Sequence, residues 1–179
     1  MRILLYVLGF IAFSIFGFFM IGVIVPVTEY ENTIVVNRSL EKTWKVFSSD
    51  TLIYDWMQGL KKIEAIKGTK MQAGAEFKMH LNEGGQDYTI IEKVRDVQEK
   101  SLYAITIDNE ALTNNVDMHF KEIAPYTTEI KSINKVEAKN WFFRSMFFFL
   151  ESDFKDQEIK TLNNLKNLIE SDPSELNNK

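Results

Sequence analysis

TIVVNRSLEKTWKVFSSD, residues 33–50, is the stretch from which the architecture of this chain can be worked out. Its first five residues are rich in β-branched side chains and predict a strand. Ser39 is a suitable N-cap for the helix that follows. The apolar residues of that helix fall on one face: Leu40, Trp44 and Phe47. The stretch therefore predicts a strand that leads directly into an amphipathic helix.

A second short helix and a series of strands are predicted downstream. The short helix follows Asp50 and ends before Gly59. Strand patterns then occur in five stretches: Ala75–Leu81, Tyr88–Val97, Ser101–Ile107, Val116–Phe120 and Thr128–Lys139. Gly84 and Gly85 provide a turn between the first two. Because the strands are consecutive and the turns are short, we expect an antiparallel sheet with one face toward water.

A long helix is predicted from about Asn140, where the apolar period becomes helical, to the stop signal at 171–173. Its apolar stripe consists of Phe143, Met146, Phe147, Leu150, Phe154, Leu162, Leu165 and Ile169. Residues 172–179 are expected to form a polar tail.

The start of this helix, residues 141–150, is apolar around nearly its whole circumference. Two explanations stay open. The segment is either a core helix crowded on two sides, or it carries an exposed lip of Phe142, Phe148 or Phe149 that touches lipid, because large exposed apolar patches mark binding surfaces.

The amino-terminal segment has the composition of a membrane-spanning helix. No charged residue occurs from Ile3 to Val25, and a helix of that length spans about 34 Å, enough to cross a bilayer core of about 30 Å. We therefore expect residues 1–26 to form an uncleaved single-pass anchor and residues 27–32 a tether to a domain at 33–171. A cleaved signal peptide and a buried hairpin are the alternatives. Against the signal peptide, the apolar run is long for a signal core and ends without a small-x-small cleavage site.

The charges that flank this segment favour an extracytoplasmic domain. Arg2 precedes the span, whereas Glu29 and Glu31 follow it and no basic residue occurs before Arg38. Basic residues next to a span tend to stay on the cytoplasmic side.

Charge and missing residue types exclude several kinds of function. The net charge is -4, and no basic stripe of the kind that binds nucleic acid is present. The nearest cluster, Lys61, Lys62, Lys67 and Lys70, is interpreted as a solvated strand edge. The chain has no cysteine, which excludes disulfides, thiolate nucleophiles and cysteine metal ligands.

The predicted order, one strand, two short helices, a run of antiparallel strands and a long final helix, resembles the helix-grip superfamily of START domains and polyketide cyclases (START-like, SRPBCC). Residues 33–50, 54–57 and 67–77 resemble that superfamily's opening, its aromatic segment and its glycine-bounded step into the third strand. The sequence departs from the pattern at Tyr126–Thr128, where the family often has a Gly-Thr turn. An anchor ahead of such a domain is similar to bacterial members described only as polyketide-cyclase-like.

The resemblance implies an α+β helix-grip fold, in which a curved antiparallel sheet wraps around a long C-terminal helix, plus the transmembrane helix. Superfamily members commonly leave the space between sheet and helix open, which implies a membrane-anchored binding module for a lipid or another apolar small molecule. The alternation of side chains along the strands and the apolar faces of the helices place ten residues around this space: Trp56, Phe77, Met79, Tyr88, Tyr103, Ile105, Met118, Phe120, Phe143 and Phe147.

Two alternatives stay open. The first is a cyclase- or aromatase-like enzyme, which would need at least two inward polar residues that meet in the cavity. The second is a co-chaperone-like interaction domain with a filled core. The volume of the cavity distinguishes the interaction domain from the binding module and the enzyme. The polarity of the cavity then distinguishes the binding module from the enzyme.

No catalytic or metal-binding constellation is recognisable in the sequence. His80 and His119 have outward parity on their strands, and no cofactor motif occurs. Glu92 has inward parity, where burial would raise its pKa, but its place near a strand end favours a solvated carboxylate. Ser132 and Asn134 are interpreted in the same way as a water-accessible part of the sheet. We expect no cofactor and no metal, and catalysis stays open.

Overall fold

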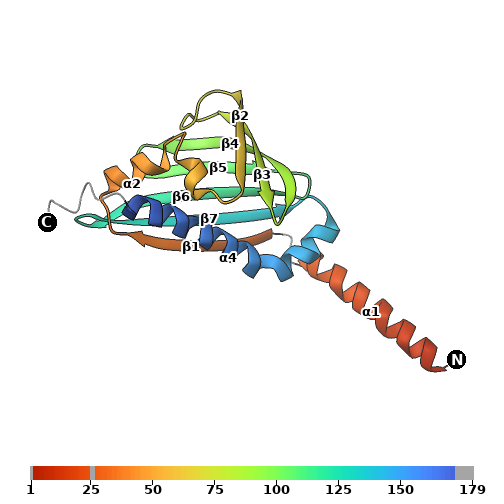
Figure 1. The fold of residues 1–179 in the computed structure, drawn as a ribbon. Helices are drawn as coiled ribbons and strands as arrows, with labels where there is room; N and C mark the ends of the chain where they lie inside the picture. Colours follow the sequence, from red (N-terminus) through yellow and green to blue (C-terminus); the bar gives the residue numbers. More distant parts are fainter. Residues whose placement is uncertain (1, 25–26, 172–179) are drawn as a thin grey trace.

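A seven-stranded antiparallel sheet forms the body of the domain (Figure 1). The computed structural model describes residues 2–24 and 27–171. The helices in this part are α1 (Arg2–Ile24), α2 (Leu40–Phe47), α3 (Ile53–Trp56) and α4 (Trp141–Ser171). The strands are β1 (Val27–Val36), β2 (Leu60–Lys67), β3 (Glu76–Glu83), β4 (Gln86–Gln98), β5 (Leu102–Asp108), β6 (Leu112–Ala124) and β7 (Thr127–Ala138).

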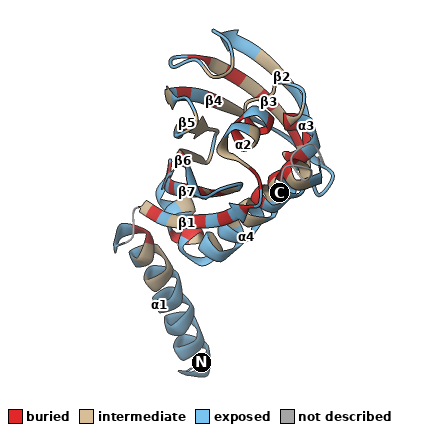
Figure 2. Cartoon of the chain, turned by 90° about the vertical axis from the view of Figure 1, so that its left-hand side faces the viewer, coloured by how far each residue is buried: buried red, intermediate tan, exposed pale blue. Residues whose placement is uncertain are grey.

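The strands lie in the order β1-β7-β6-β5-β4-β3-β2, and each neighbouring pair is antiparallel. Figure 2 shows that the sheet bends into an arc, with α2 and α3 inside the arc and α4 running beside β1. The predicted fold class, a curved antiparallel sheet around a long C-terminal helix, is confirmed.

Local signals in the sequence explain where the elements begin and turn. The Ser39 side chain accepts a hydrogen bond from the backbone N–H of Lys42 at 3.2 Å and caps α2. The Asn140 carbonyl oxygen Oδ1 accepts one from the backbone N–H of Phe143 at 3.0 Å at the start of α4. The β6–β7 turn, where the family's glycine is missing, forms with Tyr126 at φ 57°. This left-handed conformation strains a residue that has a Cβ atom.

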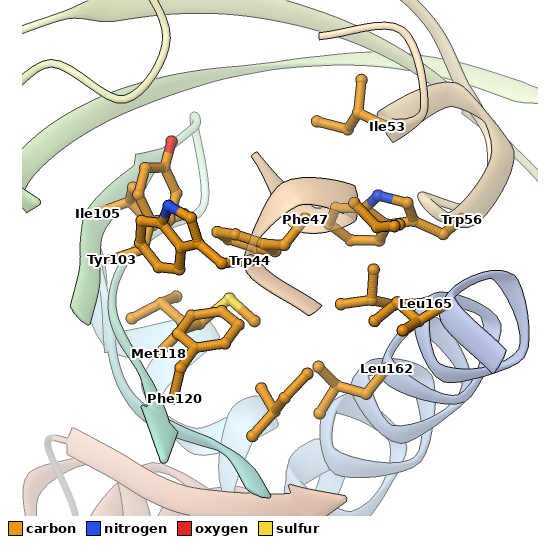
Figure 3. Packing of buried hydrophobic residues seen from close by; sticks show 14 of the residues in the cluster. Trp44, Phe47, Ile53, Trp56, Tyr103, Ile105, Met118, Phe120, Leu162 and Leu165 are labelled. Atoms are coloured by element: carbon orange, nitrogen blue, oxygen red, sulfur yellow. The ribbon is translucent and has the colours of Figure 1, made fainter. Parts of the chain in front are cut away.

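The main core lies between the sheet, the two short helices and the second half of α4. Aromatic rings meet at its centre, where Phe47 contacts Trp56, Tyr103 and Phe120 (Figure 3). The second half of α4 contributes three residues that are almost fully buried: Leu162, Leu165 and Ile169. Burying a large apolar side chain contributes about 1.5–3 kcal/mol, so these contacts fix α4 against the sheet.

The prediction of a tether at residues 27–32 was wrong. These residues form the first half of β1, and Val27 pairs with Glu137 on β7. Their polar composition concealed the strand, because the inward positions hold polar side chains, Thr28 and Asn32, that are buried nevertheless. Three of the four clustered lysines, Lys61, Lys62 and Lys67, lie on β2 at the sheet edge as expected. The interpretation of Lys70 as part of a solvated strand edge was wrong, because it lies in the loop after β2 and its side chain is largely buried. The predicted tail at 172–179 lies outside the described residues.

Helix α1 projects away from the domain (Figure 1). It is the one helix in the described part of the chain that is long and apolar enough to cross a membrane. Most of its side chains are exposed, and only Gly22, near its carboxyl end, is buried against α4. Since α1 ends at Ile24 and β1 begins at Val27, at most two residues lie between helix and sheet.

Candidate ligand-binding site

A cavity of about 310 Å³ lies between the sheet and the helices α3 and α4. Its apolar wall comprises Phe47, Ile53, Trp56, Met57, Leu81, Ile90, Ile105, Ile107, Val116, Met118, Phe154 and Leu162. Exposed residues at its rim, Gln58, Glu83, Tyr88 and Gln157, mark the side on which it opens. A second cavity of about 320 Å³ lies between the inner faces of β2 and β3 and the α3 region, and both cavities share Ile53, Lys70 and Glu92.

Seven of the ten residues that the sequence places around this space line one of the two cavities. Trp56, Tyr88, Tyr103, Ile105 and Met118 line the first. Phe77 and Met79 line the second. The alternation of inward and outward residues was therefore a good guide to the inner face of the sheet, because side chains on a strand point to opposite faces in turn.

Phe120, Phe143 and Phe147 line neither cavity. The ring of Phe120 packs against Trp44 and Phe47 in the main core. Phe143 and Phe147 belong to a second apolar cluster around Val136 and Ala138. The reason is the length of α4: a helix of 31 residues is about 46 Å long and extends beyond the cavity, so its first turns cover the end of the sheet instead.

A buried carboxyl group, Glu92 on β4, lies at the boundary of the two cavities. The hydroxyl of Tyr103 donates to its Oε1 at 2.8 Å. Burial raises the pKa of Glu92, and the Tyr103 hydrogen bond and the charge of Lys70 offset part of that effect. Burial likewise lowers the pKa of Lys70, whose Nζ donates to the carbonyl oxygen of Ser49 at 2.9 Å. The interpretation of Glu92 as solvated was wrong, because Glu92 is 7% exposed and Tyr103 and Lys70 lie beside its carboxyl group.

A second polar group gathers around Glu158 of α4. Its Oε1 accepts hydrogen bonds from Ser132 Oγ at 2.5 Å and Asn134 Nδ2 at 2.8 Å, and its Oε2 accepts one from Asn32 Nδ2 at 2.7 Å. All three donors are buried. The interpretation of Ser132 and Asn134 as water-accessible was therefore also wrong: α4 covers them. Burial and the nearby Glu158 raise the pKa of Tyr30, which also lines the cavity.

Two polar atoms that belong to the cavity lining lack a hydrogen-bond partner among the described residues. Trp56 is 5% exposed, and its indole Nε1–H, a donor, is buried and unpaired. The side-chain amide of Asn114 donates to Asn134 Oδ1 at 2.9 Å, but its own Oδ1, an acceptor, is buried and unpaired. Buried polar atoms are almost always paired in folded proteins, so these two atoms are exceptions among the residues that line the cavity.

The two histidines lie outside the cavities, as their outward parity predicts. His80 is half-buried on the outer side of β3, with Nε2 3.5 Å from Glu64 Oε1, and His119 is exposed. Within residues 2–24 and 27–171 no group of three or more His, Cys, Asp or Glu side chains could hold a metal ion.

The architecture is shared with many solved structures. Ara h 8.0201 superposes with a TM-score of 0.67 at 17% identity, over 82% of this chain and 99% of its own. The Zhui aromatase/cyclase from Streptomyces sp. R1128 superposes with a TM-score of 0.67 at 14% identity, over 80% of this chain and 94% of its own. A Thalictrum norcoclaurine synthase mutant in complex with a transition-state analogue superposes with a TM-score of 0.61 at 15% identity. The match covers 80% of this chain and 94% of the synthase chain. The chain has the helix-grip fold. No protein-family model and no curated protein matches its sequence.

Three of the polar residues that line this helix-grip cavity were not predicted from the sequence: Lys70, Asn114 and Glu158. Lys70 lies in a loop, where no periodicity indicates a direction. Glu158 carried a usable signal, because it lies four residues from both Phe154 and Leu162 and so shares the apolar stripe of the helix. Asn114 also carried a usable signal, because it shares the parity of Val116 and Met118 on β6.

Proposed function

We propose that this chain is a membrane-anchored module that holds an apolar small molecule, one that carries a hydroxyl, carbonyl or similar polar group, in the cavity between the sheet and α4. The observation that supports the proposal is the cavity of about 310 Å³ with a largely apolar wall and a few buried polar groups. Small-molecule sites commonly have this size and this combination of an apolar wall with a few polar contacts. An open cavity also counts against an interaction domain with a filled core.

The polar groups in the wall suggest the chemistry of the ligand. The Trp56 indole N–H requires an acceptor and the Asn114 Oδ1 requires a donor. A ligand that carries polar groups supplies partners of these kinds, whereas a pure hydrocarbon supplies none, and a buried polar atom without a partner costs about 1–3 kcal/mol. The proposed ligand is therefore amphiphilic, with a lipid as the leading class.

Membrane anchoring is supported by the exposure of α1. Its 23 residues project from the domain with apolar side chains such as Phe10 and Phe13 exposed at 72% and 74%. Apolar surface of this extent is unfavourable in water and favourable in a bilayer, which the helix is long enough to span. The flanking charges favour an extracytoplasmic position of the domain.

Native mass spectrometry of the full chain, purified in mild detergent, tests the binding proposal. We expect a bound molecule in the wild-type protein. Val116→Phe places extra volume in the cavity wall and should abolish the bound mass, whereas Val35→Phe, on the exposed face of β1, should retain it. The proposal would be contradicted if the wild-type protein had only the mass of its polypeptide chain. It would also be contradicted if the Val116→Phe variant still had the mass of a bound molecule.

One observation favours an enzyme of the cyclase or aromatase kind as a second candidate. Glu92, Tyr103 and Lys70 are ionisable residues that meet at the cavity wall, and such clusters with perturbed pKa values often mark catalytic sites. Two of the structural neighbours bear enzyme names. The bound molecules extracted from wild type and Glu92→Gln separate the candidates: a binding module retains the same molecule in both, whereas an enzyme accumulates a different one in the variant.

A further inference from the structure

Four large aromatic side chains stand exposed on the first three turns of α4. Trp141, Phe142, Phe148 and Phe149 are 60%, 46%, 45% and 56% exposed, and we call them the aromatic platform. The same turns bury Phe147 against the domain and Ser145 against α1. Exposed aromatic residues at this density are unusual on the surface of a domain in water, and contiguous apolar patches mark interaction sites.

The platform is in direct contact with the carboxyl end of α1. The ring of Phe18 stacks on Phe149 with a centroid distance of 6.1 Å, and Phe19 lies 4.0 Å from Trp141. The two helices approach closely where α1 has a glycine: a Cβ atom at Gly22 would lie 2.5 Å from Ser145 Oγ. Figure 1 shows the start of α4 beside the upper end of α1. The two helices therefore hold each other in place.

This contact determines the depth of the platform. Phe18 lies six residues before the end of α1 at Ile24, which is about 9 Å along the helix axis. If α1 spans a bilayer, the rings that touch Phe18 and Phe19 from the side lie at the same depth, within the outer part of the apolar layer or at its interface. Tryptophan and other aromatic rings are favoured at this level.

The charges of α4 agree with this placement. From Trp141 to Leu150 the only charged residue is Arg144, whose Nε donates to the carbonyl oxygen of Ala138 at 3.4 Å. The next residues along the helix include the exposed acids Glu151 and Asp153. The helix therefore changes from apolar to charged within one turn, as expected where it leaves a membrane interface for water.

We propose that the aromatic platform is seated in the lipid bilayer interface next to α1, so that the domain contacts the membrane at two places and not through the anchor alone. The proposal rests on the proposed anchor and commits to lipid as the partner, because the platform is continuous with a helix built to contact lipid. A second copy of this chain or another protein on the platform is an outcome that the test below detects.

A row of rings connects the platform to the cavity. Phe142 contacts Phe143, Phe143 contacts Phe147, and Phe147 contacts Phe154, with centroid distances of 5.7, 5.9 and 5.2 Å. Phe154 lines the cavity. The row of packed rings therefore connects the apolar wall of the cavity with the part of α4 that the proposal places in lipid.

Because the chain has no cysteine, single-cysteine spin labels report depth without background. We would place labels by Phe148→Cys and Phe149→Cys in the full chain, reconstituted in phosphatidylcholine and phosphatidylglycerol vesicles. Phe10→Cys reports the anchor, and Asn163→Cys, exposed on the second half of α4, reports a water-exposed position. The measurement compares relaxation by oxygen, which concentrates in lipid, with relaxation by a water-soluble nickel chelate.

We expect the ratio of oxygen to nickel accessibility at 148 and 149 to be several-fold higher than at 163 and to approach the ratio at position 10. A ratio at 148 and 149 equal to that at 163, with position 10 in lipid, would overturn the platform proposal and leave the anchor standing. A water-exposed position 10 would overturn both proposals. Strong coupling between spin labels at position 149 of two protein copies, in vesicles that hold few copies each, would show that a second copy covers the platform. This result would also overturn the proposal, because the partner would then be protein and not lipid.

Discussion

Glu92 shows how one buried residue couples the cavity to pH. In the unfolded chain a glutamate ionises near a pH of about 4.3, whereas burial raises the pKa of Glu92 in the folded protein. For a raised folded pKa, the stabilising contribution is complete below the unfolded pKa and is lost as the pH rises through the folded pKa. The ionised Glu92 therefore opposes folding at higher pH, to the extent that Tyr103 and Lys70 do not offset it.

We predict that Glu92→Gln becomes more stable relative to wild type as the pH rises from about 4 to about 8, because the amide cannot ionise. Each pH unit between the folded and unfolded pKa is worth about 1.4 kcal/mol. Chemical unfolding in detergent at a series of pH values measures this difference. The control is Glu122→Gln at an exposed position on β6, and parallel stability curves for wild type and Glu92→Gln would disprove the prediction.

For single residues on a strand, the alternation of side chains predicts direction but not burial. The inward direction of Glu92, Ser132 and Asn134 followed from the alternation of the strands. Their burial did not, because it depends on what covers the inner face. For Ser132 and Asn134 the cover is α4, whose Glu158 lies 24 or more residues away in sequence. Periodicity within one strand carries no information about such a partner.

At the scale of the element, Glu158 joins α4 to two strands. Its carboxylate accepts from Asn32 on β1 and from Ser132 and Asn134 on β7. We predict that Glu158→Ala lowers the free energy of unfolding by about 2–4 kcal/mol, because three buried donors each lose a hydrogen bond to a carboxylate. Ser132 Oγ loses its acceptor, whereas Asn32 Nδ2 still donates to the carbonyl oxygen of Lys155 and Asn134 Nδ2 to Ser132 Oγ. Asp156→Ala, exposed on the same helix, should change it by less than about 0.5 kcal/mol.

Urea unfolding of the two variants in the same detergent measures the difference. A loss for Glu158→Ala no larger than that for Asp156→Ala would mean that water reaches the three donors and that the hydrogen bonds do not fix the helix. The midpoint should move without a change in the slope, since the fold and the surface exposed on unfolding stay the same.

The sequence predicted α4 as a single amphipathic helix, but its two halves pack in different apolar clusters. The stripe residues Leu162, Leu165 and Ile169 join the main core, whereas Phe143 and Phe147 join a second cluster at the end of the sheet. Helical periodicity identifies the buried face of a helix. It does not divide that face among neighbours, since the division depends on how far the helix extends beyond the sheet.

At the scale of the whole molecule, the apolar helix α1 ends at Ile24 and the first strand of the domain begins at Val27. The main core contains no residue of α1, so the domain should fold without it. Removing residues 1–26 keeps β1 complete from Val27 onward. It also uncovers the platform residues that contact α1, which are Trp141, Phe142 and Phe149.

We predict that the protein of residues 27–179 is folded and binds vesicles weakly and reversibly, because a single interfacial contact gives marginal membrane affinity and stable attachment takes a second one. Vesicle flotation measures this binding. Replacing both Phe148 and Phe149 with serine should abolish it while each replacement lowers stability by less than about 1 kcal/mol, since both side chains are half-exposed. Replacing Asn163 and Asn167, exposed on the second half of α4, with serine should leave flotation unchanged. A loss of about 3–5 kcal/mol for each phenylalanine, the cost of truncating a buried aromatic, with flotation unchanged, would show instead that these rings stabilise the domain and do not contact lipid.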